Sequence, residues 1–214
     1  HLGVDAVLLV DPYYNGPSSL EIRLEYVAPV AAEFPDMPII PYVIPGRTGT
    51  MMHPEDLAIL YAEHPNVSAV KEATGDYENM ARTRAVCGDE YTILSGDDDR
   101  TVEMMRRSDI RAAGVISVMS NIFPGPIQRL TQAITSGDEA TADKLANGMA
   151  PLFSMVGVTT TETCAHGTVQ CKSRNPVPVK MLMNLLGMPS GPCRRPLGRM
   201  TRQGADAMIG AARQ

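Results

Sequence analysis

Short apolar runs alternate with longer amphipathic stretches over the first half of the chain. The apolar runs lie at residues 6–10, 37–42, 67–70, 91–94 and 114–118. The stretches that repeat apolar side chains on one helix face are residues 20–33, 54–63, 77–86 and 101–106. A buried run followed by a helix is a βα unit, and successive βα units build a parallel sheet. The pattern therefore predicts an α/β fold with parallel strands.

The pattern changes after residue 118, where only helices are predicted. These helices are residues 126–136, 139–156, 178–186 and 203–212. Residues 157–175 are rich in Thr, Cys, Gly and His and are predicted to form a loop. We therefore expect a βα region over residues 1–125 and a C-terminal helical region over residues 126–214.

Two fold classes accommodate five βα units, a doubly wound open sheet and part of a (β/α)8 barrel. A dinucleotide-binding sheet would carry a G-x-G-x-x-G loop after its first strand, and this sequence has none there. The distinctive polar residues instead follow the strand ends, at 13–15, 42–49, 71–72 and 95–98. In a barrel these loops open on one face, where barrel enzymes hold their active sites. This placement favours the TIM barrel.

Composition is that of an ordinary globular protein. Of the 214 residues, 44% are hydrophobic and 20% are charged, which suits one domain or the larger part of one. The net charge of −5 and the lack of a long Lys/Arg cluster argue against nucleic acid as a partner. No apolar run approaches the length of a membrane span, so a membrane partner is not expected either.

The four cysteines, Cys87, Cys164, Cys171 and Cys193, include no C-x-x-C pair. A reducing cytoplasm is the simplest setting for such a chain. Cys164 and Cys171 lie near His166, but a fourth ligand at a standard zinc spacing is missing. Free thiols are therefore favoured over a metal site.

Lys71 directly follows the apolar run 67–70 and precedes a small polar turn that ends at Gly75. At the end of a parallel strand its stem would be surrounded by apolar groups and its amine would face a pocket. Poor solvation lowers the pKa of an amine and makes it a nucleophile toward carbonyl groups. On spacing alone, a solvated lysine at a strand end explains the same sequence.

Other strand ends offer partners for such an amine. Tyr42 ends the second run, and its phenol is either a proton carrier or a core hydroxyl with a hydrogen-bond partner. Arg47 lies in a turn flanked by glycines, where it could bind a carboxylate or remain solvated. Tyr13 and Tyr14 share a turn, from which they could cap a pocket, reach a neighbouring subunit or have no function.

Acidic residues follow the fourth run, in the sequence Gly96-Asp97-Asp98-Asp99. Because a turn precedes a helix here, helix capping is the expected role of these carboxylates. Asp97 and Asp98 alone would make an incomplete Mg²⁺ site, so no metal is expected.

Six motifs occur in order along the chain. They are Pro-Tyr-Tyr-Asn at 12–15, Tyr-x-x-Pro-x-Arg-Thr-Gly at 42–49, Lys-Glu-Ala-Thr-Gly at 71–75, Ser-Gly-Asp-Asp at 95–98, Gly-Val-Ile-Ser-Val at 114–118 and Asn-Pro-Val-Pro-Val-Lys at 175–180. Together they resemble the 4-hydroxy-tetrahydrodipicolinate synthase (dihydrodipicolinate synthase) family of pyruvate-dependent class I aldolases. The superfamily also includes N-acetylneuraminate lyase. The resemblance covers nearly the whole chain and favours Lys71 as a nucleophile.

The resemblance implies three catalytic residues. Lys71 matches the lysine that forms an imine with pyruvate, and Tyr42 matches the tyrosine of the proton relay. Tyr14 matches a tyrosine that each subunit donates to the relay of its neighbour across a dimer interface.

The resemblance also implies substrate-binding residues. Arg47 matches an arginine that holds the relay and receives the carboxylate of the second substrate, and Thr48 belongs to the same motif. Gly96 and the backbone carbonyl of Ile116 match positions that line the pyruvate pocket. Tyr13 matches a residue near the allosteric lysine cleft of some members.

The implied activity is that of a Schiff-base lyase in lysine and diaminopimelate biosynthesis, which condenses pyruvate with aspartate semialdehyde. A cytoplasmic homodimer or homotetramer without metal or organic cofactor is implied, because the lysine imine itself is the electron sink. Arg47 and the Lys-Glu-Ala-Thr-Gly motif favour this over an N-acetylneuraminate or keto-deoxy sugar acid lyase. A truncated, noncatalytic partner subunit is the alternative from another class.

The main departure from the family is at the beginning of the chain. The first three βα units of the family, which carry a Gly-Thr-Thr-Gly-Glu motif that holds the carboxylate of pyruvate, have no counterpart in this sequence. Five strands do not close an eight-stranded barrel, and open sheet edges promote aggregation. We therefore expect a fragment comprising the C-terminal five βα units and a helical extension, which is inactive or aggregation-prone on its own.

Overall fold

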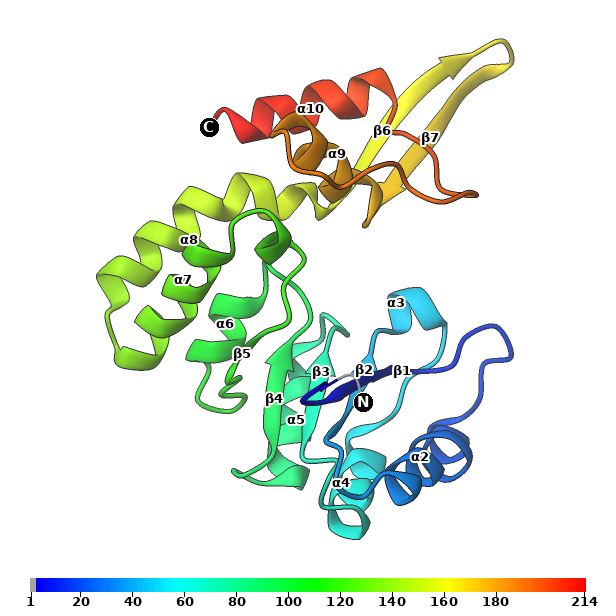
Figure 1. Ribbon diagram of the computed structural model, residues 1–214, viewed down its shortest axis with the longest axis vertical. Helices are drawn as coiled ribbons and strands as arrows, with labels where there is room; N and C mark the ends of the chain where they lie inside the picture. Colours follow the sequence, from blue (N-terminus) through cyan, green and yellow to red (C-terminus); the bar gives the residue numbers. More distant parts are fainter. Residues whose placement is uncertain (1–2) are drawn as a thin grey trace. The chain divides into compact units, whose positions relative to one another are not determined.

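The computed structural model describes residues 3–214, whose course is shown in Figure 1. The chain divides into two compact units between Ile116 and Ser117. The first unit contains a parallel sheet with helices, and the second contains helices and a β-hairpin. Among the described residues, no helix is both long enough and apolar enough to cross a membrane.

Five parallel strands form the sheet of the first unit, in the order β1-β2-β3-β4-β5. They are β1 (Val7–Val10), β2 (Ile39–Val43), β3 (Ala69–Glu72), β4 (Thr92–Ser95) and β5 (Gly114–Val115). Each strand pairs with the next one along the chain, so the order has no reversal of the kind that marks a doubly wound sheet. The predicted α/β fold with a parallel sheet is confirmed.

The connections between the strands carry the predicted helical stretches and the short helix α3, which was not predicted. They are α1 (Ser19–Glu21), the π-helical segment η1 (Ile22–Val27), α2 (Ala28–Glu33), α3 (Pro45–Thr48), α4 (Pro54–Glu63), α5 (Tyr77–Cys87) and α6 (Thr101–Arg106). Two of the starts are capped by side chains, because Ser18 and Glu21 form a capping box at α1 and Asp76 accepts from two backbone N–H groups of α5.

The two faces of the sheet differ in burial. Val43 and Val70 lie on the face that packs against the helices and are fully buried in the core. Successive side chains of a strand point to opposite faces, so Tyr42 and Lys71 lie on the other face. Val10, on that second face, is 42% exposed. The face away from the helices therefore presents the polar side chains of the strand ends.

The second unit begins with the short helix η2 (Met119–Asn121) and the helices α7 (Pro124–Ser136) and α8 (Glu139–Phe153). The short helix η3 (Ser154–Val156) leads into β6 (Gly157–Cys164) and β7 (Gly167–Arg174), and α9 (Val177–Leu185) and α10 (Arg202–Ala212) follow. Val158, Leu182 and Met208 form a small buried core in this unit.

The predicted loop over residues 157–175 is instead an antiparallel hairpin, drawn in yellow in Figure 1. The prediction of helices alone in the C-terminal region is therefore wrong. The run Val158 to Thr161 is β-branched throughout and favours a strand. In the first half of β6 only Val158 and Thr160 are buried, so apolar alternation, the usual strand signal, is nearly absent.

Candidate active site

Lys71 in β3 lies beside Tyr42 in β2. The two residues are register partners in the sheet, and Lys71 Nζ lies 3.9 Å from the centroid of the Tyr42 ring. The Lys71 residue is only 7% exposed. Two paired strands, rather than a loop, therefore bring the predicted nucleophile and the predicted proton carrier together.

The pKa of Lys71 is lowered from its ordinary value. Burial is the largest cause, and the carboxylates of Asp97 and Asp98 act in the opposite direction. A larger share of this amine is therefore neutral at a given pH than in an exposed lysine. The neutral amine is the form that attacks a carbonyl carbon.

The pKa of Tyr42 is raised, first by burial and then by the charge of Asp97, while Arg47 lowers it. Tyr42 therefore keeps its phenolic proton at neutral pH. A protonated phenol beside a neutral amine can donate a proton to an oxygen atom held between them.

Asp97 has surroundings that its predicted capping role does not explain. The N-cap residue of α6 is Arg100, whose side chain makes no capping hydrogen bond. Burial raises the pKa of the Asp97 carboxyl, while the charge of Lys71 lowers it. Asp97 is thus a charged neighbour of both Lys71 and Tyr42. Sequence reasoning missed this role, although the position directly after a strand end was a signal for it.

Gly96 lies where the end of β4 approaches the end of β3. Its N–H donates to the carbonyl oxygen of Glu72 at 2.7 Å. A Cβ atom on Gly96 would lie 2.6 Å from Ala73 Cβ and 3.0 Å from Glu72 O, so no side chain fits. The glycine allows the two strand ends to meet next to Lys71.

Ile116 completes a row of strand ends. Its N–H donates to the carbonyl oxygen of Ser95 at 2.9 Å, which continues the pairing of β4 with β5. Tyr42, Lys71, Gly96 and Ile116 thus lie at or just beyond the carboxyl ends of four neighbouring strands, β2 to β5.

Arg47 and Thr48 belong to α3, a single helical turn after β2. Thr48 is 8% exposed, and its hydroxyl hydrogen bonds with the carbonyl oxygens of Thr50 at 2.8 Å and Ile44 at 3.1 Å. The Thr48 hydroxyl is therefore engaged in the turn that presents Arg47.

Tyr13 and Tyr14 project into solvent, with 76% and 92% of each residue exposed. Tyr14 adopts the left-handed backbone conformation, with a φ of 74°. Within residues 3–214 Tyr14 makes no hydrogen bond, ring contact or ionic contact. The structure of one chain therefore does not bring Tyr14 to Tyr42.

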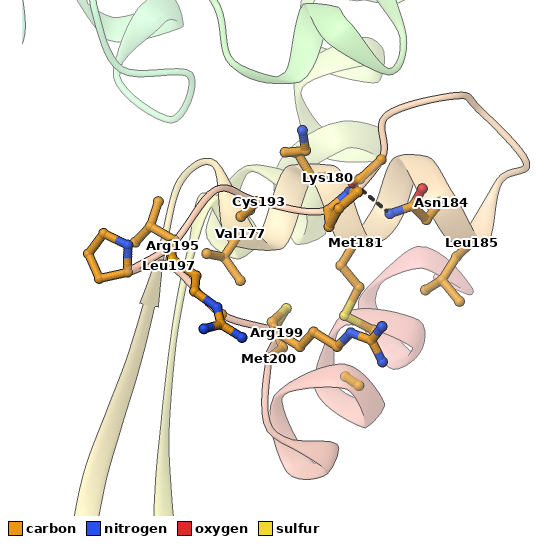
Figure 2. A pocket seen from close by; sticks show the side chains of 15 residues that line it. Val177, Lys180, Met181, Asn184, Leu185, Cys193, Arg195, Leu197, Arg199 and Met200 are labelled. Atoms are coloured by element: carbon orange, nitrogen blue, oxygen red, sulfur yellow. Dashed lines mark hydrogen bonds between the residues drawn. The ribbon is translucent and has the colours of Figure 1, made fainter.

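A cavity of about 1040 Å³ lies in the second unit, against α9 and α10 (Figure 2). Apolar side chains and three cations, Lys180, Arg195 and Arg199, line it. No acidic residue, no tyrosine and none of the predicted site residues is among the described residues that line it. The predicted site residues therefore lie outside this cavity, in the first unit.

Cys164 and Cys171, considered above as metal ligands, lie in the hairpin as free thiols. In the part of the chain from residue 3 onward, no group of three or more His, Cys, Asp or Glu side chains is placed to hold a metal ion.

Comparison with known proteins gives a consistent result. A family model described as the dihydrodipicolinate synthetase family matches residues 1–214. The 4-hydroxy-tetrahydrodipicolinate synthase of Desulforudis audaxviator is 38% identical over 202 residues, which are 94% of this chain and 62% of that protein. The enzyme of the same name from Geobacter sulfurreducens is 39% identical over 199 residues, or 93% of this chain and 62% of that protein.

Solved structures of enzymes with the same name superpose on this chain. The 4-hydroxy-tetrahydrodipicolinate synthase of Methylacidiphilum fumariolicum SolV superposes with a TM-score of 0.86 at 30% identity, covering 99% of this chain and 64% of that one. The enzyme from Cyanidioschyzon merolae, solved with lysine bound, gives a TM-score of 0.84 at 32% identity, covering 98% of this chain and 65% of that one. The chain spans a little over three-fifths of the length of these relatives, 62% for the two curated enzymes.

Proposed function

Since this chain belongs to the dihydrodipicolinate synthetase family, we propose that it carries the reactive lysine of a 4-hydroxy-tetrahydrodipicolinate synthase. The proposed reaction condenses pyruvate with aspartate semialdehyde, a step of lysine and diaminopimelate biosynthesis in the cytoplasm. The observation that carries this proposal is the buried Lys71 amine 3.9 Å from the centre of the Tyr42 ring.

The first half of the reaction forms an imine. The neutral Lys71 amine attacks the ketone carbon of pyruvate, and the carbinolamine oxygen takes a proton from Tyr42 and leaves as water. The resulting imine draws electrons from the adjacent methyl group, which loses a proton to the Tyr42 phenoxide to give an enamine and restore the phenol. Because the imine is the electron sink, this step requires no metal or organic cofactor.

The second half forms the carbon–carbon bond. The enamine carbon adds to the aldehyde carbon of aspartate semialdehyde, and the aldehyde oxygen takes up a proton. The amine of that substrate then attacks the imine carbon and displaces the Lys71 amine, which closes the ring and restores the enzyme. Arg47, in the turn next to Tyr42, is placed to pair with a substrate carboxylate.

We further propose that the five strands are neighbouring strands of a (β/α)8 barrel. The sequential parallel order and the half-exposed second face of the sheet support this, because an all-parallel sheet is normally covered on both faces. In this proposal the barrel region extends to residue 125, and residues 126–214 form the C-terminal region.

The proposed assembly is a homodimer or homotetramer in which Tyr14 serves the site of a neighbouring chain. The exposure of 92% and the lack of contacts of Tyr14 within residues 3–214 support a role outside its own chain. Exposed aromatic side chains of this kind are common at protein interfaces.

A panel of aldehydes tests which second substrate the enamine accepts. With a protein extended at its amino terminus by a segment that carries a Gly-Thr-Thr-Gly-Glu motif, we expect aspartate semialdehyde and pyruvate to give the cyclic product. N-acetylmannosamine or glyceraldehyde with pyruvate should give little product. Lys71→Met should abolish every reaction and serves as the control. Faster turnover of a sugar aldehyde would contradict the synthase assignment and support a sugar acid lyase of the same superfamily.

A further inference from the structure

Asp11, the residue after β1, was not among the residues predicted for the site. It is 1% exposed, and its N–H donates to the carbonyl oxygen of Tyr42 at 3.2 Å. Its Oδ2 atom accepts a hydrogen bond from the N–H of Met52 at 3.2 Å. Asp11 therefore links the end of β1 both to the end of β2 and to the segment that follows the Arg47 turn.

A second set of bonds ties the same two segments together. The hydroxyl of Thr50 donates to the carbonyl oxygen of Pro17. The N–H of His53 donates to Ser19 Oγ at 2.7 Å. Residues 50–53 are thus bonded to the chain both before and after the turn 12–16, which carries Tyr13 and Tyr14.

We propose that Asp11 is a positioning residue that clamps the Tyr14 turn and the Arg47 turn into one unit at the carboxyl ends of β1 and β2. Without the Asp11 side chain, the Tyr14 turn would be bonded to residues 50–53 on its Pro17 side only. The effect of this clamp on catalysis rests on the proposed function, whereas the clamp itself rests on the hydrogen bonds alone.

The protonation of Asp11 agrees with this role. Burial raises its pKa to about 7; the Met52 N–H acts to lower it and the charge of the buried Glu72 acts to raise it. The pKa of Tyr26 is raised by burial and, to a smaller extent, by the charge of Asp11. Within residues 3–214, Asp11 Oδ1 has no hydrogen-bond partner. A neutral carboxyl can accept from Met52 without leaving an unsolvated charge.

NMR on the 214-residue chain tests the clamp without any assay of activity. Asp11→Leu removes the acceptor, and we expect amide exchange at Met52 to accelerate about fivefold or more, as for the loss of one hydrogen bond. Backbone order parameters of residues 13–16 should fall with it. Asp11→Asn keeps an acceptor oxygen and should behave like the wild type. Asp5→Asn, at an exposed aspartate just before β1, is the control for lost charge.

A structural role without clamping would give a different result. If Asp11→Leu accelerates exchange equally in β3 and β4, or leaves Met52 and residues 13–16 unchanged, the proposal is overturned. If Asp11→Leu does not fold, Thr50→Val removes the second clamp bond and should mobilise residues 13–16. Unchanged order parameters in that variant would also overturn the proposal.

Kinetics separate the clamp from the proposed reaction. In a protein that shows the condensation, Asp11→Leu should raise KM for the aldehyde while Lys71 still forms its imine with pyruvate, and Asp11→Asn should restore KM. If a version extended at its amino terminus with a Gly-Thr-Thr-Gly-Glu motif forms no imine but the NMR changes occur, the proposed function fails and the clamp stands.

Discussion

At the scale of single residues, opposing influences set the pKa of Lys71. Burial lowers it, and Asp97 and Asp98 raise it. The fraction of neutral amine, and with it the rate of imine formation, should therefore rise with pH through the depressed pKa. Asp97 and Asp98 limit how far burial lowers the pH range of that rise below the range of an ordinary lysine.

Asp97→Asn removes one of the two charges that hold the pKa of Lys71 up. We expect the rise in the rate of imine formation to move to lower pH, because a more acidic solution is then needed to keep half of the amine protonated. The measurement is the rate of borohydride trapping with pyruvate as a function of pH. Glu90→Gln, at an exposed carboxylate, is the matched control. An unchanged profile, or a move to higher pH, would show that Asp97 does not act on Lys71.

Sequence reasoning found Lys71 and Tyr42 because both lie where apolar runs end, and strand ends can be read from the pattern. It did not find Asp11, although this residue also follows a run. A buried carboxylate is defined by contacts with distant segments, here with the N–H of Met52, and no local pattern records them. Gly96 was found through its motif, but the reason for glycine, the approach of Ala73, required coordinates.

At the scale of secondary-structure elements, Arg84 of α5 connects three segments at the end of the sheet opposite the site. Its guanidinium donates to the carbonyl oxygens of Gly88 at 2.6 Å, Tyr91 at 2.7 Å and Ile110 at 3.0 Å. The residue is 7% exposed. It therefore fixes the end of α5 to the loops that lead into β4 and β5.

Arg84→Met should lower the free energy of unfolding by about 2–4 kcal/mol, because several buried carbonyl groups lose a charged donor. Arg82→Met on the same helix is the matched control. Its ion pair with Glu55 is exposed on both sides, at 58% and 55%, and such pairs contribute about 0–1 kcal/mol. Chemical denaturation followed by circular dichroism measures both. Equal losses in the two variants would contradict the account of Arg84.

Elements were predictable where periodicity was strong. Residues 54–63 and 101–106 were predicted as helices and are α4 and α6 with the same bounds. The hairpin β6–β7 was not predicted because it is largely solvent-exposed. Its sequence therefore has few apolar residues at the alternate positions that indicate a strand. A strand with little buried surface has little hydrophobic pattern to read.

At the scale of the whole molecule, the sequential parallel order of β1 to β5 collects the carboxyl ends of the strands on one edge. The spacing of the βα units predicted parallel strands, and the sheet confirms them. What the spacing could not provide is the pairing register, which sets Tyr42 directly opposite Lys71. This register places the motif that contains Tyr42 beside the motif that contains Lys71.

The most direct test of the central claim is borohydride trapping with pyruvate, followed by peptide mass mapping. It should be done on the 214-residue chain and on an amino-terminally extended version that supplies a Gly-Thr-Thr-Gly-Glu motif. We predict a reduced pyruvate adduct on Lys71 in the extended version, with the other lysines unlabelled and no adduct in Lys71→Met. Labelling of the 214-residue chain at Lys71 would show that this chain suffices for the imine and that the expectation of an inactive fragment is wrong. If neither version is labelled at Lys71, the aldolase account is wrong for this protein.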